Sequence, residues 1–386
     1  MRRRVVDAVR ALAPLLRKGS EQAECESRLP EASAAALSGA GLFRLGVPRA
    51  FGGYEAPLAT VLEVTAELAR ACPSSSWVVA LSYGAQHIAS AFGEQVRHEL
   101  WGAGTDVAMC GSFSGHDLVA AKVDGGQLLS GRWPWSSGAY QAGWAALEMP
   151  VADEHGAVLD RAMALVPVAE LSIGNTWDMA GMRGTGSHTL VSDQVFVPDH
   201  RIRYLAEIVQ GPTGPIEPLY RVPLGCLALT LVGPLLGMAQ EVFDETMRVV
   251  TAGKPLAGSS YPRLADSPSI QANLADAATL IDSARLHLFR SADQVDEAAA
   301  TGTQLDMTTR ARVRMDSGYA SKCLRDAVHL LLSVGGASTF ARTNPVQRYW
   351  RDLETAARHP TISTELSREI YGRALVGSSD QVSFLI

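Results

Sequence analysis

The sequence predicts a mostly α-helical protein of the α+β class, in which helices, a central β-barrel and a C-terminal helix bundle follow one another. Three observations predict this order. Residues 1–105 carry apolar side chains at helical spacing, the next part consists of short β-type runs between glycine turns, and the remainder contains three long apolar segments. We therefore expect three domains, covering residues 1–106, 107–205 and 206–386.

The bulk composition describes a globular protein with a large core. Of the 386 residues, 47% are hydrophobic and 19% are charged, and the net charge is −6. This acidic balance argues against nucleic acid or an anionic membrane as the main partner. The five cysteines are far apart and lack CxxC spacing, which indicates reduced thiols rather than disulfides or a zinc site (Cys25, Cys72, Cys110, Cys226, Cys323).

No targeting or membrane segment is recognisable. The N-terminus Met1-Arg-Arg-Arg lacks an apolar stretch long enough for a signal peptide. The longest apolar run, Leu224 to Met238, is interrupted by three glycines and a proline, so we expect a buried helix rather than a membrane span. These features predict a soluble cytoplasmic protein.

The N-terminal part is predicted to form four helices. The first carries an apolar stripe at 3.6-residue spacing, from Val5 to Leu16. Prolines, which fit the first turn of a helix, open the second and third. The fourth is apolar and is expected to be capped by Pro73-Ser-Ser-Ser76. The later three helices are predicted over Pro30–Ala40, Pro57–Ala71 and Trp77–Phe92.

The central part is predicted to be a compact antiparallel sheet or small barrel. Asp124-Gly-Gly126 is a hairpin turn between two β-type runs, Leu118–Val123 and Gln127–Trp133. Further short runs continue the pattern: Trp144–Met149, Ala162–Val168, Thr189–Val191 and Gln194–Val197.

The C-terminal part is predicted to be a bundle of long helices. A glycine- and proline-rich loop, Gly211-Pro-Thr-Gly-Pro215, separates it from the barrel. Each predicted helix exceeds the ordinary length, which favours packing in a bundle: Pro223–Thr251, Ser267–Ala300 and Met307–Val334.

Four separate segments carry a family resemblance. Leu37–Gly53, Ser130–Gly138, Gly181–Ser187 with Val195–Pro198, and Asn344–Pro360 together resemble the acyl-CoA dehydrogenase superfamily over nearly the whole chain. The resemblance implies an N-terminal helical domain, a central β-barrel and a C-terminal four-helix bundle. The Trp-x-Ser-Ser-Gly and Arg-Gly-Thr-Gly-Ser motifs resemble most closely the flavin-dependent monooxygenase branch, which includes the oxygenase components of two-component hydroxylases.

His359, followed by Pro360, stands where this family's dehydrogenases carry a catalytic glutamate. Proline has no titratable group, whereas a neutral imidazole can accept or donate a proton near pH 7. The resemblance implies that His359 helps to form or hold a flavin hydroperoxide. Because the chain has eight other histidines, a structural histidine is the alternative.

Trp135, Ser136 and Ser137 are the predicted flavin contacts. On a strand, residues two apart point to the same face, so the indole of Trp135 and the hydroxyl of Ser137 should project together. The resemblance implies that the indole packs on the isoalloxazine and that the hydroxyl binds near N5. The alternative is a barrel-core tryptophan beside an exposed serine.

Two glycine-containing segments are further cofactor candidates. Arg183 and Ser187, with His188, lie in a glycine-rich turn that could hold phosphate, the flavin edge or substrate, although an ordinary barrel turn explains it equally well. Gly335 and Gly336 follow a predicted helix. The resemblance implies that they approach the flavin of a neighbouring subunit, whereas a simple helix stop is the alternative.

His87 and Tyr83 lie on the fourth predicted helix, which walls the substrate pocket in the family. They are therefore candidate substrate contacts. A core histidine with satisfied hydrogen bonds is the alternative for His87.

The sequence contains no dinucleotide-binding GxGxxG unit, Walker motif, HExxH or EF-hand pattern. We therefore expect no bound metal and a separate NAD(P)H-flavin reductase that supplies reduced FAD or FMN (FADH2 or FMNH2). Together with the resemblance, this predicts a monooxygenase that uses O2 and a C4a-hydroperoxyflavin to hydroxylate a phenol, indole or polycyclic aromatic. The resemblance also implies a homotetramer or homodimer.

Three alternatives remain from the sequence. The first is N- or S-oxygenation by the same branch. The second is an acyl-CoA dehydrogenase whose catalytic base has moved to another helix, to Glu241 or Glu245. The third is a flavin-binding or scaffold protein without catalysis.

Overall fold

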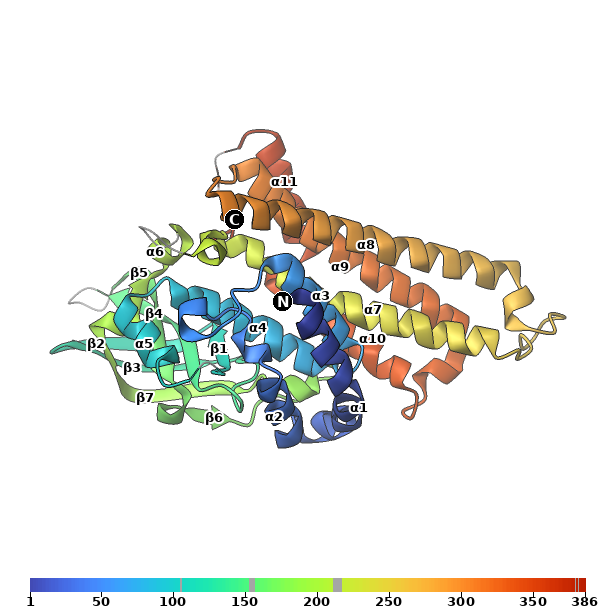
Figure 1. The fold of residues 1–386 in the computed structure, drawn as a ribbon, viewed down its shortest axis with the longest axis horizontal. Helices are drawn as coiled ribbons and strands as arrows, with labels where there is room; N and C mark the ends of the chain where they lie inside the picture. Colours follow the sequence, from blue (N-terminus) through green and yellow to red (C-terminus); the bar gives the residue numbers. More distant parts are fainter. Residues whose placement is uncertain (105, 153–156, 211–216, 379, 381) are drawn as a thin grey trace.

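A computed structural model describes the chain except residues 105, 153–156, 211–216, 379 and 381. Two β-sheets lie at one end of the elongated molecule, the N-terminal helices cover its middle, and three long helices project at the other end (Figure 1). This arrangement confirms the predicted order of helices, sheets and helices. The predicted loop at Gly211–Pro215 lies outside the described residues.

The N-terminal part contains five helices among the described residues. They are α1 (Arg2–Glu26), α2 (Glu31–Gly39), α3 (Leu58–Ala69), α4 (Pro73–Ser90) and α5 (Glu94–Trp101). The prediction that Pro73–Ser76 precedes the fourth helix is wrong, because Pro73 is its first residue and the serines form its first turn. Proline fits there because the first helical N–H groups have no partner within the helix. The short α5 was not predicted.

The central part consists of two four-stranded sheets. The first has the order β1-β4-β5-β8 and the second β2-β3-β7-β6. β1 pairs with β4 in parallel, so the prediction of a wholly antiparallel sheet is wrong at this edge. The strands are β1 (Met109–Ser112), β2 (His116–Val123), β3 (Gly126–Trp133), β4 (Trp144–Ala152), β5 (Val158–Pro167), β6 (Ser172–Gly174), β7 (Thr189–Pro198) and β8 (Ile202–Tyr204).

The C-terminal part begins with the short helix α6 (Leu205–Gln210) and two 3-10 turns, the first of them η6 (Pro218–Arg221), and continues as longer helices. The central helix α9 packs against α7, α8 and α11. The shorter α10 and α11 were not predicted. The elements are η7 (Leu224–Leu227), α7 (Ala228–Thr251), α8 (Pro268–Thr301), α9 (Met307–Gly335), α10 (Pro345–Ala356), η10 (Pro360–Ile362) and α11 (Thr364–Leu375).

α7 and α3 cross at backbone contact. A Cβ atom at Gly233 would lie 2.1 Å from Oγ1 of Thr65, and one at Gly237 would lie 1.9 Å from the carbonyl oxygen of Ala66. Real Cβ atoms do not approach other atoms so closely, so any larger residue would force the helices apart. Two glycines one turn apart therefore join the N-terminal and C-terminal parts.

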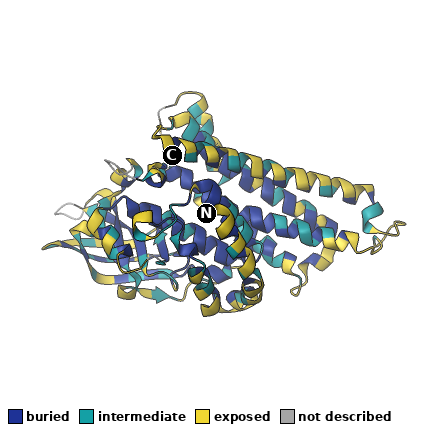
Figure 2. Cartoon of the chain, in the orientation of Figure 1, coloured by how far each residue is buried: buried dark blue, intermediate teal, exposed yellow. Residues whose placement is uncertain are grey.

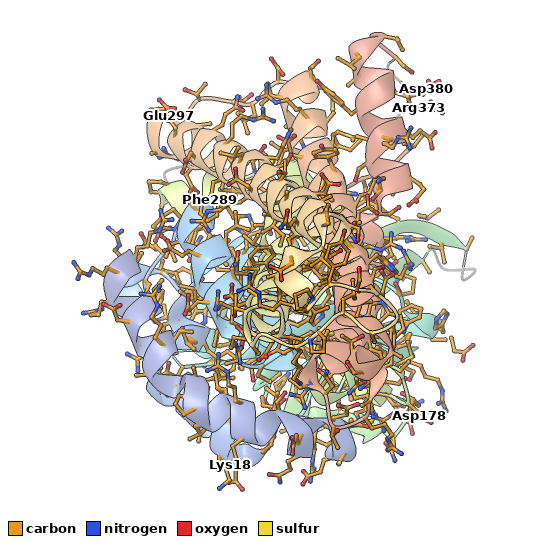
Figure 3. All side chains as sticks on the ribbon, turned by 90° about the vertical axis from the view of Figure 1, so that its right-hand side faces the viewer. Lys18, Asp178, Phe289, Glu297, Arg373 and Asp380 are labelled. Atoms are coloured by element: carbon orange, nitrogen blue, oxygen red, sulfur yellow. The ribbon has the colours of Figure 1, made fainter. Side chains whose placement is uncertain are left out.

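Buried residues form one large cluster through the helices and a second cluster between the two sheets, while exposed residues cover the outside (Figure 2). Charged side chains such as Lys18, Asp178 and Glu297 lie at the periphery (Figure 3). The segment Leu224–Thr251 is long and apolar enough to cross a membrane, but 89% of its apolar window is buried inside the protein. This burial is typical of a core helix.

Candidate functional site

The first half of α4 brings the separate candidate segments together. A Cβ atom at Gly138 would lie 2.8 Å from Cγ1 of Val78, and one at Gly184 would lie 2.9 Å from Oγ of Ser74. The Trp77 and His359 rings meet edge to face, with 5.7 Å between their centroids. The Trp135–Gly138 segment, the glycine-rich turn and the His359 segment therefore meet on one side of α4.

The predicted geometry of Trp135 and Ser137 is wrong. β3 ends at Trp133, and Trp135 adopts a left-handed backbone conformation with φ 58°. The chain therefore turns instead of continuing as a strand, and the two side chains separate. Trp135 is 58% exposed, whereas Ser136 and Ser137 are buried. The exposed indole is free to cover a planar ligand, while Ser137 points toward the glycine-rich turn.

Ser137 belongs to a chain of three hydroxyls. Thr185 donates to the carbonyl oxygen of Met182 at 2.7 Å. Since the Thr185 proton is used there, Ser187 donates to Thr185 Oγ1 at 2.6 Å, and Ser137 in turn donates to Ser187 Oγ at 2.7 Å. This direction leaves Ser137 with free lone pairs and no free proton. Ser137 can therefore accept a hydrogen bond from a ligand but has no proton left to donate.

His359 precedes the 3-10 turn η10 and caps it. Its Nδ1 accepts a hydrogen bond from the Thr361 backbone N–H at 3.3 Å, which places the proton of the neutral ring on Nε2. Burial, and then the charge of Arg314, lowers the pKa of His359 to about 4. The imidazole is therefore neutral at physiological pH.

Arg314 on α9 was not predicted as a site residue. Its side chain is 1% exposed, and its Nε and Nη1 have no hydrogen-bond partner among the described residues. Burial lowers the pKa of Arg314 to about 10, opposed by the nearby Cys226. Nothing in the sequence separates Arg314 from the other arginines at this end of α9, because the signal is its burial beside His359.

Two of the predicted residues in the glycine-rich turn, Arg183 and His188, hold the turn in place through hydrogen bonds to the protein. Arg183 uses all three guanidinium nitrogens to bind protein groups, including the carbonyl oxygen of Glu24 at 2.9 Å and Asp178 at 2.7 Å. Nδ1 of His188 accepts the backbone N–H groups of Thr176 and Trp177. These bonds fasten the turn to the end of α1 and to the segment after β6, so only Ser187 of the predicted set faces Ser137.

The remaining candidates form two pairs, Gly335 with Gly336 and Tyr83 with His87. Gly335 and Gly336 end α9, about 30 Å along the helix from Arg314, so within one chain they do not reach His359. Tyr83 is buried and donates to the carbonyl oxygen of Ala56 at 2.9 Å. His87 is 7% exposed, its Nδ1 has no partner among the described residues, and burial lowers its pKa to about 4.

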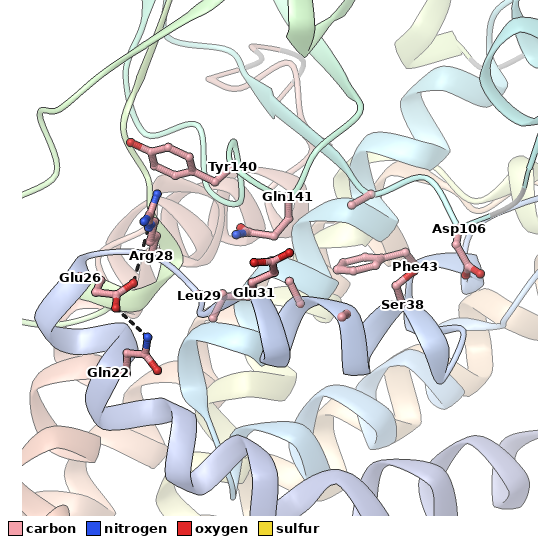
Figure 4. Close-up of a pocket in the computed structure, with 13 residues that line it drawn as sticks. Gln22, Glu26, Arg28, Leu29, Glu31, Ser38, Phe43, Asp106, Tyr140 and Gln141 are labelled. Carbon is pink, nitrogen blue, oxygen red and sulfur yellow. Dashed lines mark hydrogen bonds and ion pairs between the residues drawn. The ribbon is translucent and has the colours of Figure 1, made fainter.

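A separate cavity of about 720 Å³ lies between α1, α2 and the segment after Gly138. Arg28 stacks over the Tyr140 ring at 5.2 Å, and Glu31 lies near Gln141 (Figure 4). Its lining is polar and includes neither Ser137 nor His359. This cavity is therefore distinct from the candidate site around α4.

The side chains around α4 fit a flavin. Trp135 offers an exposed aromatic face, Ser137 offers lone pairs, and His359 offers a neutral ring. The described residues hold no group of histidines, cysteines and carboxylates that could bind a metal ion. The donor set therefore suits a planar organic cofactor better than a metal.

Comparisons with known proteins identify the family of the chain. Residues 2–101 match the acyl-CoA dehydrogenase N-terminal domain and residues 229–364 match the acyl-CoA dehydrogenase C-terminal domain. The chain is 32% identical to the oxygenase component of an FADH2-dependent resorcinol hydroxylase from Rhizobium sp., over 97% of this chain and 94% of that protein. It is also 32% identical to the HsaA oxygenase subunit of a flavin-dependent monooxygenase from Rhodococcus jostii, over 95% and 97%.

Solved structures show the same relationship. XiaF from Streptomyces sp., solved with FADH2 and glycerol, superposes with a TM-score of 0.95 at 32% identity, covering 99% of this chain and 97% of that chain. The 3-HSA hydroxylase from Rhodococcus sp. RHA1 gives 0.89 at 29% identity, covering 99% and 98%. Sequence and fold thus agree, and the chain belongs to the acyl-CoA dehydrogenase superfamily, within its flavin-dependent monooxygenase oxygenase components.

Proposed function

We propose that this oxygenase component hydroxylates an aromatic small molecule, with reduced FAD or FMN supplied by a separate NAD(P)H-dependent reductase. When bound and reduced, the flavin activates O2, so that one oxygen atom enters the substrate and the other leaves as water. Relatives named for resorcinol, p-hydroxyphenylacetate and indole-3-acetate support an aromatic substrate. We further propose a cytoplasmic location.

The main observation that supports this proposal is the neutral imidazole of His359. An acyl-CoA dehydrogenase needs a carboxylate to remove a proton, and this position offers an imidazole instead. The alternative base Glu241 lies 3.4 Å from an Arg17 nitrogen and 3.2 Å from an Arg70 nitrogen. Glu245 is paired with Arg248. These ion pairs leave both carboxylates committed to structure and support oxygenation over dehydrogenation.

Each site residue has a proposed role toward the flavin or substrate. Trp135 covers the flavin ring, with Ser136 setting the turn, and Ser137 accepts a hydrogen bond from the flavin edge. His359 holds or moves the proton needed when oxygen is transferred. The neutral ring carries its proton on Nε2. It can donate that proton, and it can accept one at the same nitrogen after the first has left. Among the other predicted contacts, His87 retains an unpaired nitrogen and is the better supported substrate contact.

The oligomeric state is part of the proposal. Gly335 and Gly336 lie at the projecting end of the bundle, where Gly336 has φ 64° and no atom within 4 Å of a Cβ position. Such bare backbone suits close approach to the flavin of a neighbouring subunit in a homotetramer or homodimer.

The test is a paired assay. The chain with NADH, a generic flavin reductase, flavin and air should convert an aromatic panel to products that each contain one added oxygen atom from isotopically labelled O2. The same chain under anaerobic conditions, with an acyl-CoA and an electron acceptor, should give no turnover. Turnover only in the second arm would refute the proposal, and label in a nitrogen or sulfur product alone would replace ring hydroxylation with N- or S-oxygenation.

A further inference from the structure

One face of α4 is only partly buried, although the rest of the helix is fully buried. Between Pro73 and Ser90, only Leu81 and Gly84 are not buried. They are three residues apart and so lie on the same face of the helix. A Cβ atom at Gly84 would meet no atom within 4 Å. We call Leu81 and Gly84 the open face of α4.

The open face lies on the same side of α4 as the residue that contacts His359. Trp77, which contacts the His359 ring, lies four residues before Leu81 and seven before Gly84, so all three share one side of the helix. At 1.5 Å per residue, Gly84 lies about 10 Å along the axis from Trp77. A flat molecule that starts at His359 and lies along this side would reach Gly84 only if it were longer than one aromatic ring.

The neighbours of Gly84 do not fill the space. On one side, Val78 and Ser82 face Gly138 and the backbone N–H of Met109. On the other side, His87 lies 6.0 Å from the Tyr220 ring. Gly84 lies between these two contacts around the helix, where no side chain is within 4 Å of a Cβ position. The open space is therefore bounded by packed side chains on both flanks.

Glycine at this position has a measurable cost. In the interior of a helix, glycine is less stable than alanine by about 0.5–1 kcal/mol, because it loses more backbone freedom on folding. Elsewhere in the chain, helix glycines such as Gly233 and Gly237 are needed for close backbone contact. Gly84 has no such contact, so packing does not explain its missing side chain.

We propose that Gly84 sets the size of the substrate site, and that the natural substrate is an aromatic molecule of two or more fused rings that extends along α4 from His359 to Gly84. This inference rests on the proposed aromatic hydroxylation. A side chain at position 84 would occupy the place of the distal ring and leave the ring at His359 unaffected.

The experiment uses three probes of increasing length: phenol, a naphthol and a phenanthrol. Binding of each is measured by calorimetry to the anaerobic protein with reduced flavin, and product formation is measured separately with reductase and air. Gly84→Leu should weaken binding of the naphthol and the phenanthrol at least about tenfold and leave phenol within about twofold. Gly84→Ala should show a smaller loss in the same order and a slightly raised melting temperature.

Gly372→Leu is the matched control. Gly372 also lies inside a helix, α11, with no atom within 4 Å of a Cβ position, but it is exposed and remote from α4. It should change binding of none of the probes. If Gly84→Leu weakens all three probes equally, or none, the size-setting role is refuted. If Gly84→Leu weakens binding of the two larger probes selectively, as expected, but no probe is hydroxylated by any variant, Gly84 keeps its role and the proposed hydroxylation fails.

Discussion

Ser187→Ala tests whether the hydroxyl chain tunes the protein to reduced flavin. Reduced flavin carries a hydrogen on N5, whereas oxidised flavin presents a lone pair there. In the structure, Ser137 gives its proton to Ser187 at 2.7 Å and is left as an acceptor, which suits the reduced form. Without the Ser187 oxygen, the proton of Ser137 is free to turn toward the flavin, where it suits the oxidised form.

The expected change in relative affinity for reduced and oxidised flavin follows from one hydrogen bond lost and one gained. A neutral hydrogen bond contributes about 0.5–1.5 kcal/mol net, so exchanging one between the two redox forms changes their relative affinity by about 1–3 kcal/mol. This corresponds to about 5- to 150-fold in the ratio of the two dissociation constants. The ratio is measured anaerobically with reduced and oxidised flavin, or as the midpoint potential of the bound flavin.

Two control variants isolate the effect. Ser187→Thr keeps a hydroxyl and should keep the preference for reduced flavin. Ser192→Ala removes another buried hydroxyl, which donates to the carbonyl oxygen of Leu129 at 2.6 Å and has no bond to Ser137. If Ser187→Ala changes the ratio no more than Ser192→Ala does, the direction of the proton chain has no bearing on flavin binding and the reasoning is wrong.

Three further predictions concern single residues. His359→Ala should lower coupled turnover by about 10²- to 10⁴-fold and raise oxygen consumed per product, whereas His188→Ala should lower the melting temperature without changing that ratio. Burial and, after it, the charge of Arg314 lower the pKa of His359 from 6.5 to about 4, so Arg314→Met should raise that pKa in part and move the acid limb of the activity profile to higher pH, and an unmoved limb would contradict the link. Asp352→Asn concerns stability: burial raises the Asp352 pKa from 3.8 to about 6, so its ionisation costs up to about 3 kcal/mol above pH 6 and nothing below pH 3.8. This variant should therefore melt higher than the parent at pH 7 but not below pH 3.8, and an equal gain at both pH values would show another cause.

Long apolar periodicity made the architecture predictable. The three long helices and the hairpin at Gly125 and Gly126 appear within a few residues of their predicted bounds, because stripes and turn glycines are local signals. The short helices α10 and α11 were missed, since amphipathic segments of this length look like polar loops in one sequence. The parallel β1–β4 pair was also missed, because pairing between distant segments leaves no local pattern.

The site was predictable in its segments but not in its geometry. Motif resemblance brought Ser137, Ser187 and His359 to attention, and the structure places all three around α4. The turn at Trp135 was missed because no sequence pattern indicates that a tryptophan will adopt a left-handed backbone conformation. Arg314 and Gly84 became visible only through burial and open space, which are properties of the packed molecule rather than of either residue.

The glycine crossing of α3 and α7 limits how this scaffold can be recombined. Gly233 and Gly237 accept the surface of α3 at Thr65 and Ala66 without room for a single added methyl group. A chimera that takes its C-terminal helices from one relative and its N-terminal helices from another would combine two surfaces that were never fitted together. Exchange of specificity between relatives should therefore move α3, α4 and α7 as one inherited block, and a parental boundary drawn between the sheets and the bundle should yield insoluble protein.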